Sequence, residues 1–303
     1  MTAIETTKLT KRYDEETALD EFNLRVERGE VFGFLGPNGA GKSTTIDVFL
    51  DFIRPTEGRA VVTDHDPQQT PRKVRQNIGV LPDEYSLYDS LTGIEHIELA
   101  KDLHGSEEDT DALLSRVGLA DAGDQAAGSY SKGMAQRLAF GMALVGDPDV
   151  LILDEPSAGI DPNGLQDMRE IIRAEAEAGT TVFFSTHILE QVEAVCDRVA
   201  IINDGELVAV DTISGLRDTF DERSTLTLSI DGTPTGLELG NLNGVSDVEY
   251  TDGTLNVQLR NPQQKSTVIA QVEASGVSVT NIEIEEASLA DLFSQLTTGG
   301  DSE

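Results

Sequence analysis

The sequence predicts an α/β fold built on a parallel sheet, followed by a small α+β domain. Three short apolar runs, at residues 31–35, 150–153 and 181–184, have the length and composition of buried strands. Helical patterns precede or follow each run, as in a sheet whose parallel strands are joined by helices. With 303 residues and 38% hydrophobic content, the chain can bury a sizeable core, and its length favours one large domain with a smaller appended one.

The first strand leads directly into the first helix. Residues 31–35 (VFGFL) form the apolar run, and Gly36-Pro37 ends it. Beyond a glycine-rich loop, apolar residues recur at helical spacing as far as Ile53, where Arg54-Pro55 stops the helix. Residues 31–53 are therefore expected to form a strand, a loop and a helix.

The stretch between Thr92 and Val145 is predicted to hold consecutive helices. Thr92 with Glu95 has the pattern of a capping box, in which each side chain bonds the backbone N–H of the other residue. Ser106 with Asp109 resembles a second helix start. A third helix is predicted from an apolar stripe that consists of Leu138, Met142 and Val145.

Beyond about residue 218 the pattern changes to that of a small α+β domain. Alternating apolar residues are interrupted at Asp231-Gly232 and at Asp252-Gly253, which are β-hairpin signals. A helix is expected at residues 268–272 and a strand at residues 277–284. We expect two domains, residues 1–218 and 219–303, the second of them accessory or regulatory. It ends in a predicted amphipathic helix that contains Leu289, Leu292, Phe293 and Leu296.

The charge balance excludes one class of partner. The chain has 22 Lys and Arg against 55 Asp and Glu, a formal net charge of −33, so nucleic acid is not expected to bind. No stretch approaches the ~20 apolar residues that a bilayer span requires, and the N-terminus lacks the apolar segment of a signal peptide. A cytoplasmic protein is therefore expected. Cys196 is the one cysteine, so no internal disulfide is possible.

Residues 36–43 (GPNGAGKS) match the phosphate-binding pattern G-x-x-x-x-G-K-[ST], and they stand between a strand and a helix as that motif requires. The glycines allow backbone N–H groups to surround phosphate oxygens at a helix N-terminus. Lys42 would reach the outer phosphates, and the Ser43 hydroxyl would bind Mg²⁺. A glycine turn with an incidental lysine is the alternative. The candidate nucleotide-binding residues are Gly36, Pro37, Asn38, Gly39, Ala40, Gly41, Lys42, Ser43 and Thr44.

Asp154 and Glu155 directly follow the strand at residues 150–153. They are expected at the carboxyl edge of the sheet, where ligands of open α/β sheets bind. Asp154 would hold Mg²⁺, and Glu155 would polarise the water that attacks the terminal phosphate. A solvated turn or a helix cap is the alternative for such an acidic pair. His187 follows the third strand at the same edge, where it could contact the γ-phosphate or orient the water, although a lone histidine is more often structural.

Four motifs follow one another along the chain: GPNGAGKS at residues 36–43, Tyr130-Ser131-Lys132-Gly133-Met134, Ile152-Leu153-Asp154-Glu155-Pro156 and Ser185-Thr186-His187. Their order resembles that of the ATP-binding subunits of ABC transporters. The resemblance implies a P-loop NTPase with a RecA-like core, an antiparallel β subdomain and a helical signature subdomain at about residues 86–146. It also implies Mg²⁺-dependent ATP hydrolysis by a homodimer or a pair of ATPase subunits. These would dock on a separate integral membrane permease at the inner face of the cell membrane.

The signature loop of this family has the form Leu-Ser-Gly-Gly-Gln and faces the nucleotide of the other subunit. Ser131 and Gly133 keep this pattern, so they are candidate nucleotide contacts. The tail at residues 287–293 is similar to a segment of exporter-type subunits, so export is expected. The signature also matches a variant of the ABC-2 type exporter branch, through its departures at Tyr130, Lys132 and Met134.

The resemblance implies roles for three further positions. Tyr13 falls where the family stacks an aromatic ring on adenine, although a place in a β-hairpin core is the alternative. Ala158-Gly159-Ile160-Asp161 resembles the D-loop of the dimer interface, and Asp161 would also suit a helix cap. Asp83 stands where the family has glutamine, and it could bind Mg²⁺ or belong to an acidic surface turn. The adjoining loop is the expected permease dock, with apolar contacts from Leu87, Tyr88 and Leu91.

Two other classes of protein are the alternatives. A soluble ABC-type ATPase of translation or repair usually has two cassettes or a long coiled-coil insertion, and this chain has neither. A GTPase of the common type would need an Asn-Lys-x-Asp motif, which the sequence lacks. A transport motor is therefore favoured.

The acid excess predicts that stability depends on salt. Like charges repel one another in a compact fold, and molar salt shortens the Debye length to ~3 Å. A protein with a charge of −33 and seven lysines is therefore expected to come from a salt-loving host. Its melting temperature should rise as KCl is increased from tenth-molar to molar, as thermal melts can measure. A melting temperature that is flat or falls with KCl would reject this expectation.

Overall fold

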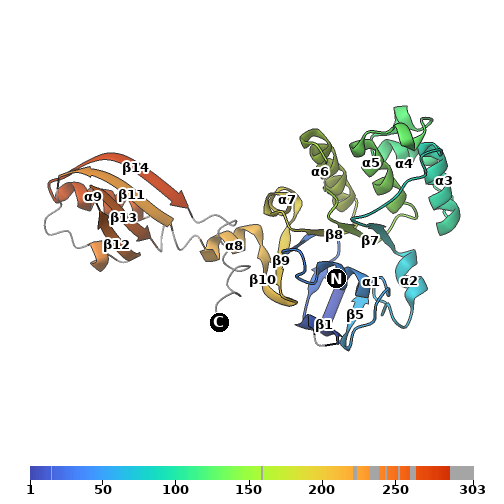
Figure 1. Ribbon diagram of the computed structural model, residues 1–303, viewed down its shortest axis with the longest axis horizontal. Coiled ribbons are helices and arrows are strands. Elements are labelled where there is room, and N and C mark those ends of the chain that lie inside the picture. Colours follow the sequence, from blue (N-terminus) through green and yellow to red (C-terminus); the bar gives the residue numbers. More distant parts are fainter. Residues whose placement is uncertain are drawn as a thin grey trace. The chain divides into compact units, whose positions relative to one another are not determined.

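Figure 1 shows a computed structural model of the protein, which describes residues 1–14, 16–157, 160–220, 224–232, 239–242, 244–251, 253–259 and 264–286. The chain divides into two compact units, Met1–Thr212 and Ile213–Glu303. The boundary expected at residue 218 falls inside α8 (Ile213–Phe220), the first helix of the second unit. Several expected features lie outside the described residues: Ala158-Gly159, Asp252 and the tail with its closing helix at residues 287–296.

A six-stranded sheet forms the centre of the first unit, with the strand order β10-β9-β4-β8-β7-β6. Its neighbouring strands are parallel except β10 with β9, so the predicted α/β fold is confirmed. The three strands predicted from apolar runs are β4, β7 and β8. The strands are β4 (Val31–Leu35), β6 (Ile78–Leu81), β7 (Val150–Asp154), β8 (Thr181–Thr186), β9 (Arg198–Asn203) and β10 (Glu206–Thr212).

The register of the central strands decides where the candidate site residues meet. Leu35 of β4 pairs with Thr186 of β8, and Asp154 of β7 pairs with Ser185. Because these strands are parallel, the segments that follow them leave the sheet at one edge. The phosphate loop, the acidic pair and His187 all begin there.

An antiparallel sheet and helix α1 (Lys42–Phe49) share one hydrophobic core with the central sheet. The Phe49 ring packs edge-on against Phe183 of β8, with 5.5 Å between ring centroids. Helix α1 ends at Phe49 and not near Ile53 as predicted, because Asp51 has a left-handed φ of 56° that a right-handed helix cannot contain. The remaining elements are β1 (Thr2–Tyr13), β2 (Glu16–Phe22), β3 (Arg25–Glu27), β5 (Glu57–Val62) and α2 (Pro71–Gln76).

Helices fill the stretch that we call the helical subdomain, residues 86–146. The predicted capping box is confirmed, since Thr92 and Glu95 each accept a hydrogen bond from the other's backbone N–H. The second helix was predicted to start at Ser106, which is three residues too early. Asp109 caps that helix, and the Ser106 hydroxyl donates to Glu108. The helices are α3 (Gly93–His104), α4 (Thr110–Arg116) and α5 (Lys132–Ala143), with short 3₁₀ turns at Ala120–Ala122 and Ala127–Ser129.

Two further helices, α6 (Pro162–Glu177) and α7 (Leu189–Val195), follow β7 and β8. An ion pair joins α6 to α4 of the helical subdomain. Arg116 Nη2 lies 2.6 Å from Glu175 Oε2, and Arg116 Nε donates to Oε1 at 3.2 Å. The Glu175 side chain is 6% exposed, so Arg116 is the partner of a carboxylate that has little contact with water.

The second unit contains a four-stranded antiparallel sheet with the order β12-β13-β11-β14. The predicted turn after Thr251 joins β12 to β13, where Thr251 pairs with Thr254. The hairpin predicted at Asp231-Gly232 is wrong, because β11 lies between β13 and β14 and cannot pair with β12. The elements are β11 (Ser224–Asp231), a 3₁₀ turn at Leu239–Asn241, β12 (Val245–Thr251), β13 (Thr254–Leu259), α9 (Lys265–Ala274) and β14 (Ser278–Glu286).

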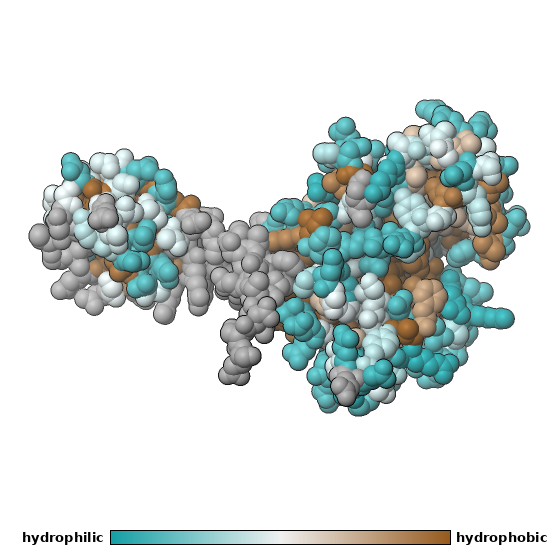
Figure 2. Space-filling view, in the orientation of Figure 1, coloured by the Kyte–Doolittle hydropathy of each residue, from teal (hydrophilic) through white to brown (hydrophobic). Residues whose placement is uncertain are grey.

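The visible surface of the first unit is largely hydrophilic, with hydrophobic residues gathered between the helical subdomain and the region of α1 and α2 (Figure 2). Within the part of the chain that the structure describes, no helix is both long and apolar enough to cross a bilayer.

The Arg116–Glu175 pair generates a stability prediction. Arg116→Met should lower the free energy of unfolding by about 3 kcal/mol, because it leaves a buried carboxylate without its partner. Arg25→Met is the matched control: it removes a 2.8 Å pair with Glu27 whose side chains are 63% and 40% exposed, and it should cost far less. Urea denaturation measures both values. Equal losses in the two variants would show that burial of Glu175 does not govern the pair.

Candidate functional site

The phosphate loop between β4 and α1 depends on glycine at two positions. Gly39 and Gly41 have φ values of 86° and 105°, which other residues rarely adopt. A Cβ at Gly41 would also lie 2.6 Å from the Ala18 carbonyl oxygen. Gly41 is the N-cap of α1, so the loop presents backbone N–H groups at a helix N-terminus.

Lys42 lies over this loop with its side chain 7% exposed. Its Nζ donates to the carbonyl oxygens of Gly36 at 2.8 Å and Pro37 at 3.1 Å. The same atom is 3.5 Å from Glu155 Oε1. Lys42 therefore connects the loop to the carboxylate at the end of β7.

A polar pocket of about 360 Å³ opens at this edge of the sheet. It brings together residues from the loop, from the end of β7 and from the segment after β6. Tyr13, Ser131, Gly133 and His187 are not in its lining. The lining residues are Asn38, Gly39, Gly41, Lys42, Ser43, Thr44, Asp83, Asp154 and Glu155.

Asp154 is a half-buried acid of this pocket. Burial raises the pKa of its carboxyl group, and the nearby charges of Asp83 and Glu155 act in the same direction. The neighbouring Ser185 hydroxyl opposes this shift, but it does not reach hydrogen-bond geometry, and Asp154 Oδ1 is buried without a hydrogen-bond partner among the described residues. A divalent cation would satisfy such an oxygen, so the site fits Mg²⁺.

The protein donors alone do not enclose a metal ion. Within the described part of the chain, no group of three or more His, Cys, Asp or Glu side chains is placed to hold one. Mg²⁺ commonly takes one or two carboxylates together with substrate phosphates and water. Asp154, with Ser43 and Asp83 in the same lining, therefore suits a cation that arrives with a nucleotide.

Glu155 and His187, which follow the paired ends of β7 and β8, are in direct contact. His187 Nδ1 lies 2.9 Å from Glu155 Oε1. The other oxygen, Oε2, accepts a hydrogen bond of 3.1 Å from the Thr186 hydroxyl. Glu155 has a left-handed φ of 45°, an unfavourable conformation for a residue with a Cβ that persists where the surroundings enforce it.

Several contacts of this centre had no signal in the sequence. Thr186 belongs to a recognised motif, but nothing in the sequence connects it to Glu155. Gln191, on α7, bonds both Thr186 and Ser157, and Gln136 bonds the Pro156 carbonyl oxygen. Such contacts depend on how the helices pack on the sheet, which periodicity does not specify.

The signature residues lie apart from the pocket of the same chain. Ser131 is exposed and is the N-cap of α5, where its hydroxyl accepts from the Met134 N–H at 3.2 Å. A Cβ at Gly133 would have nothing within 4 Å. An open helix N-terminus of this kind suits an anion from another molecule.

Tyr13 and Asp161 occupy plain structural settings. Tyr13 ends β1 with 44% exposure, and Lys11 Nζ lies 4.6 Å from its ring centroid, so the ring is not in a hairpin core. Asp161 caps α6 by accepting from two backbone N–H groups, which confirms its predicted capping role.

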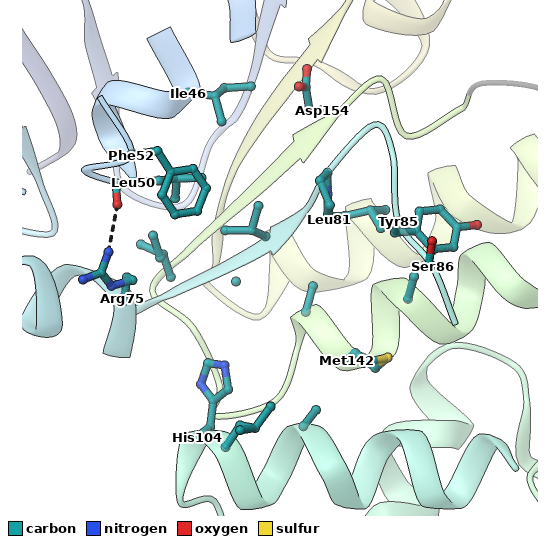
Figure 3. Close-up of a pocket in the computed structure, with 18 of the residues that line it drawn as sticks. Ile46, Leu50, Phe52, Arg75, Leu81, Tyr85, Ser86, His104, Met142 and Asp154 are labelled. Carbon is teal, nitrogen blue, oxygen red and sulfur yellow. Dashed lines mark hydrogen bonds between the residues drawn. The ribbon is translucent and has the colours of Figure 1, made fainter. Parts of the chain in front are cut away.

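A second, apolar pocket of about 560 Å³ lies between the central sheet with α1 and the helical subdomain (Figure 3). Figure 3 shows Phe52 and Leu50 on one side and Tyr85 and Met142 on the other. Of the expected docking contacts, Leu87 lines this groove, whereas Tyr88 and Leu91 do not. The Tyr88 N–H donates to His96 Nε2 at 3.0 Å, and its ring remains 63% exposed.

Comparison with known proteins agrees with these motifs. Residues 19–158 match the family model "ABC transporter", and residues 212–297 match "ATP-binding protein DrrA1-3-like, C-terminal domain". The daunorubicin/doxorubicin resistance ATP-binding protein DrrA of Streptomyces peucetius is 34% identical over 305 residues, which cover 97% of this chain and 92% of the relative. The bacitracin transport ATP-binding protein BcrA of Bacillus licheniformis is 34% identical over 303 residues, which cover 99% and 98%.

A solved structure of the ATP-binding subunit of an ABC transporter has the same fold as the first unit. Its TM-score is 0.65 at 29% identity, and the match covers 72% of this chain and 93% of that one. The expected family and exporter branch are confirmed, and translation or repair proteins are not supported. The chain therefore belongs to the ABC transporter ATP-binding proteins: it is the Mg²⁺-dependent, ATP-hydrolysing subunit of a transporter whose permease is a separate membrane component.

Proposed function

We propose that this chain powers the export of antibiotic-like compounds through its permease. The support is the likeness to DrrA and BcrA, which runs through the C-terminal domain as well as the nucleotide-binding part. The names of these relatives concern resistance to daunorubicin and doxorubicin and the transport of bacitracin. ATP is cytoplasmic and the permease lies in the membrane, so the proposed location is the inner face of the cell membrane.

The polar pocket is the proposed site of ATP hydrolysis. The phosphate loop with Lys42 holds the phosphates, and Ser43, Asp83 and Asp154 would hold Mg²⁺. When bound, this ion neutralises the charge that develops on the phosphate oxygens. Tyr13 stacks on the adenine ring. Two signature residues, Ser131 and Gly133, contact the nucleotide of the partner subunit.

Glu155 is the proposed general base. Its carboxylate lines the pocket beside Lys42, which is the observation that carries this assignment. Glu155 takes a proton from the attacking water while the phosphate loop holds the phosphates still. His187, whose imidazole meets Oε1 at 2.9 Å, orients the carboxylate toward the terminal phosphate.

Glu155→Gln tests the assignment of the base. Turnover should fall at least ~100-fold, since removal of a positioned base typically has that effect, while ATP binding persists and an ATP-bound dimer accumulates. Glu57→Gln is the control, because Glu57 is an exposed carboxylate paired with Arg12 on another sheet. Steady-state ATPase assays and gel filtration with ATP give both readouts. Normal hydrolysis by the Glu155→Gln protein with its permease would refute the assignment.

The second unit has a proposed accessory role. None of its described residues lines either pocket, and its sheet has its own core. We assign it to dimer geometry or to coupling with the permease, not to nucleotide binding.

The apolar groove is the proposed dock for a cytoplasmic segment of the permease with an apolar face. One loop joins the groove to the hydrolysis site, since Asp83 lines the polar pocket and Tyr85 lines the groove. Phe52 and Leu103 are 68% and 80% exposed at the groove, and a contiguous exposed apolar surface of this kind favours a partner. By linkage, ATP changes permease affinity by the same factor that the permease changes ATP affinity.

Replacement of Phe52 and Leu103 by Ser tests the dock. Permease affinity should fall at least tenfold, because each large apolar side chain contributes about 1.5–3 kcal/mol when buried. ATP hydrolysis by the chain alone should not change. Tyr250→Ser, at a 41% exposed tyrosine of the second unit, is the control. Co-purification measures permease binding, and ATPase assays measure stimulation by the permease. Unchanged permease binding by the folded double variant would show that the groove is not part of the interface.

A further inference from the structure

Two buried glutamines hold the chain immediately after Glu155. Gln136 of α5 donates from Nε2 to the carbonyl oxygen of Pro156, and Gln191 of α7 accepts from the hydroxyl of Ser157. The two glutamines are 4% and 7% exposed, and neither lines the polar pocket. Buried amides are kept in place by their hydrogen bonds, so these two fix the backbone that leaves the proposed base.

Gln191 also reaches the carboxylate of Glu155 through one intervening residue. The Thr186 hydroxyl lies 3.1 Å from Gln191 Oε1 and 3.1 Å from Glu155 Oε2. It accepts a further hydrogen bond of 3.2 Å from the Ile188 N–H. Thr186 is fully buried, so water does not compete for this hydroxyl.

The Thr186 hydroxyl has one proton and two possible acceptors, Gln191 Oε1 and Glu155 Oε2. Thr186 can donate to Gln191 or to Glu155, but not to both at once. The charged carboxylate is the stronger acceptor, so the proton of Thr186 goes to Glu155 Oε2, while Gln191 Oε1 accepts from Ser157. The other oxygen, Glu155 Oε1, then faces His187 Nδ1 at 2.9 Å and Lys42 Nζ at 3.5 Å.

The backbone conformation of Glu155 also needs neighbouring contacts to hold it in place. Its left-handed φ of 45° is unfavourable and persists only where neighbouring contacts enforce it. The Glu155 N–H donates to the Ser185 carbonyl oxygen at 2.9 Å, which fixes the residue on the sheet side. The Gln191–Ser157 bond fixes the chain on the other side.

We propose that Thr186 and Gln191 are positioning residues for Glu155. Thr186 donates to Oε2, so Oε1 is kept as the oxygen that takes the proton of the attacking water, and Gln191 holds Ser157 and thereby the backbone that leaves Glu155. The proposal rests on Glu155 being the general base assigned above. Neither residue lines the polar pocket, so their effect is on turnover and not on ATP binding.

Thr186→Val and Gln191→Met test this proposal in the full chain. Each should lower kcat about tenfold, because Thr186→Val removes a hydrogen bond to the charged carboxylate and Gln191→Met releases Ser157, while the KM for ATP stays within about twofold. Thr186→Ser keeps the hydroxyl and should restore kcat. Gln191→Met serves as the independent variant if Thr186→Val does not fold.

Thr6→Val is the matched control. Thr6 is 4% exposed in the antiparallel sheet, and its hydroxyl donates to the Phe22 carbonyl oxygen at 3.0 Å and accepts from the Leu24 N–H at 2.7 Å. The change deletes a comparable pair of buried hydrogen bonds away from Glu155. It should lower the melting temperature and leave kcat unchanged.

A double variant separates a positioning effect from a general structural one. If Thr186 acts through Glu155, then Glu155→Gln with Thr186→Val should hydrolyse ATP in single turnover no more slowly than Glu155→Gln alone. A further tenfold loss in the double variant would overturn the proposal, as would wild-type kcat in folded Thr186→Val and Gln191→Met. If Glu155→Gln itself keeps normal turnover, the base assignment fails. If Glu155→Gln is inactive but the Thr186 and Gln191 variants are not, the positioning proposal alone fails.

Discussion

The in-register pairing of the parallel strands β4, β8 and β7 is the constraint on which the site depends. It ends all three strands at one edge of the sheet, so segments that are far apart in sequence begin side by side. The phosphate loop, the acidic pair and His187 meet there because the strands that precede them end side by side. The cores on both faces of the sheet enforce the register, since shifting any strand by one residue would move its side chains to the opposite face.

The charge distribution of the pocket explains why nucleotide and metal suit it together. Asp83, Asp154 and Glu155 line it with Lys42 as the one basic residue in that lining. Burial already raises the pKa of Asp154, so its ionised form is costly without a cation. The phosphate loop offers the opposite preference, because backbone N–H groups at the N-terminus of α1 favour an anion. A complex of Mg²⁺ with a triphosphate satisfies both parts of the pocket.

The features that depend on residues close together in the sequence were predicted correctly. The strands, the glycine loop and the Thr92 capping box follow from residues close in sequence, and they are where the sequence puts them. The end of α1 was missed because the left-handed Asp51 has no composition signal, and the hairpin after β11 failed because β13 and β14 occupy both edges of that strand. Thr186 and Gln191 could not be assigned because their contacts join distant segments: Thr186, at the end of β8, bonds Glu155, and Gln191, on α7, bonds Ser157 and Thr186. Which expected docking residues face the groove was likewise decided by packing.

The most direct test of the account is a structure of the chain with Mg²⁺ and a non-hydrolysable ATP analogue. We expect the γ-phosphate to lie between Lys42 and the carboxylate of Glu155, with Mg²⁺ bound by the Ser43 hydroxyl. We also expect the Ser131 contact to this nucleotide to come from a second copy of the chain. A γ-phosphate away from this edge of the sheet, or one bound by Ser131 of the same chain, would contradict the account.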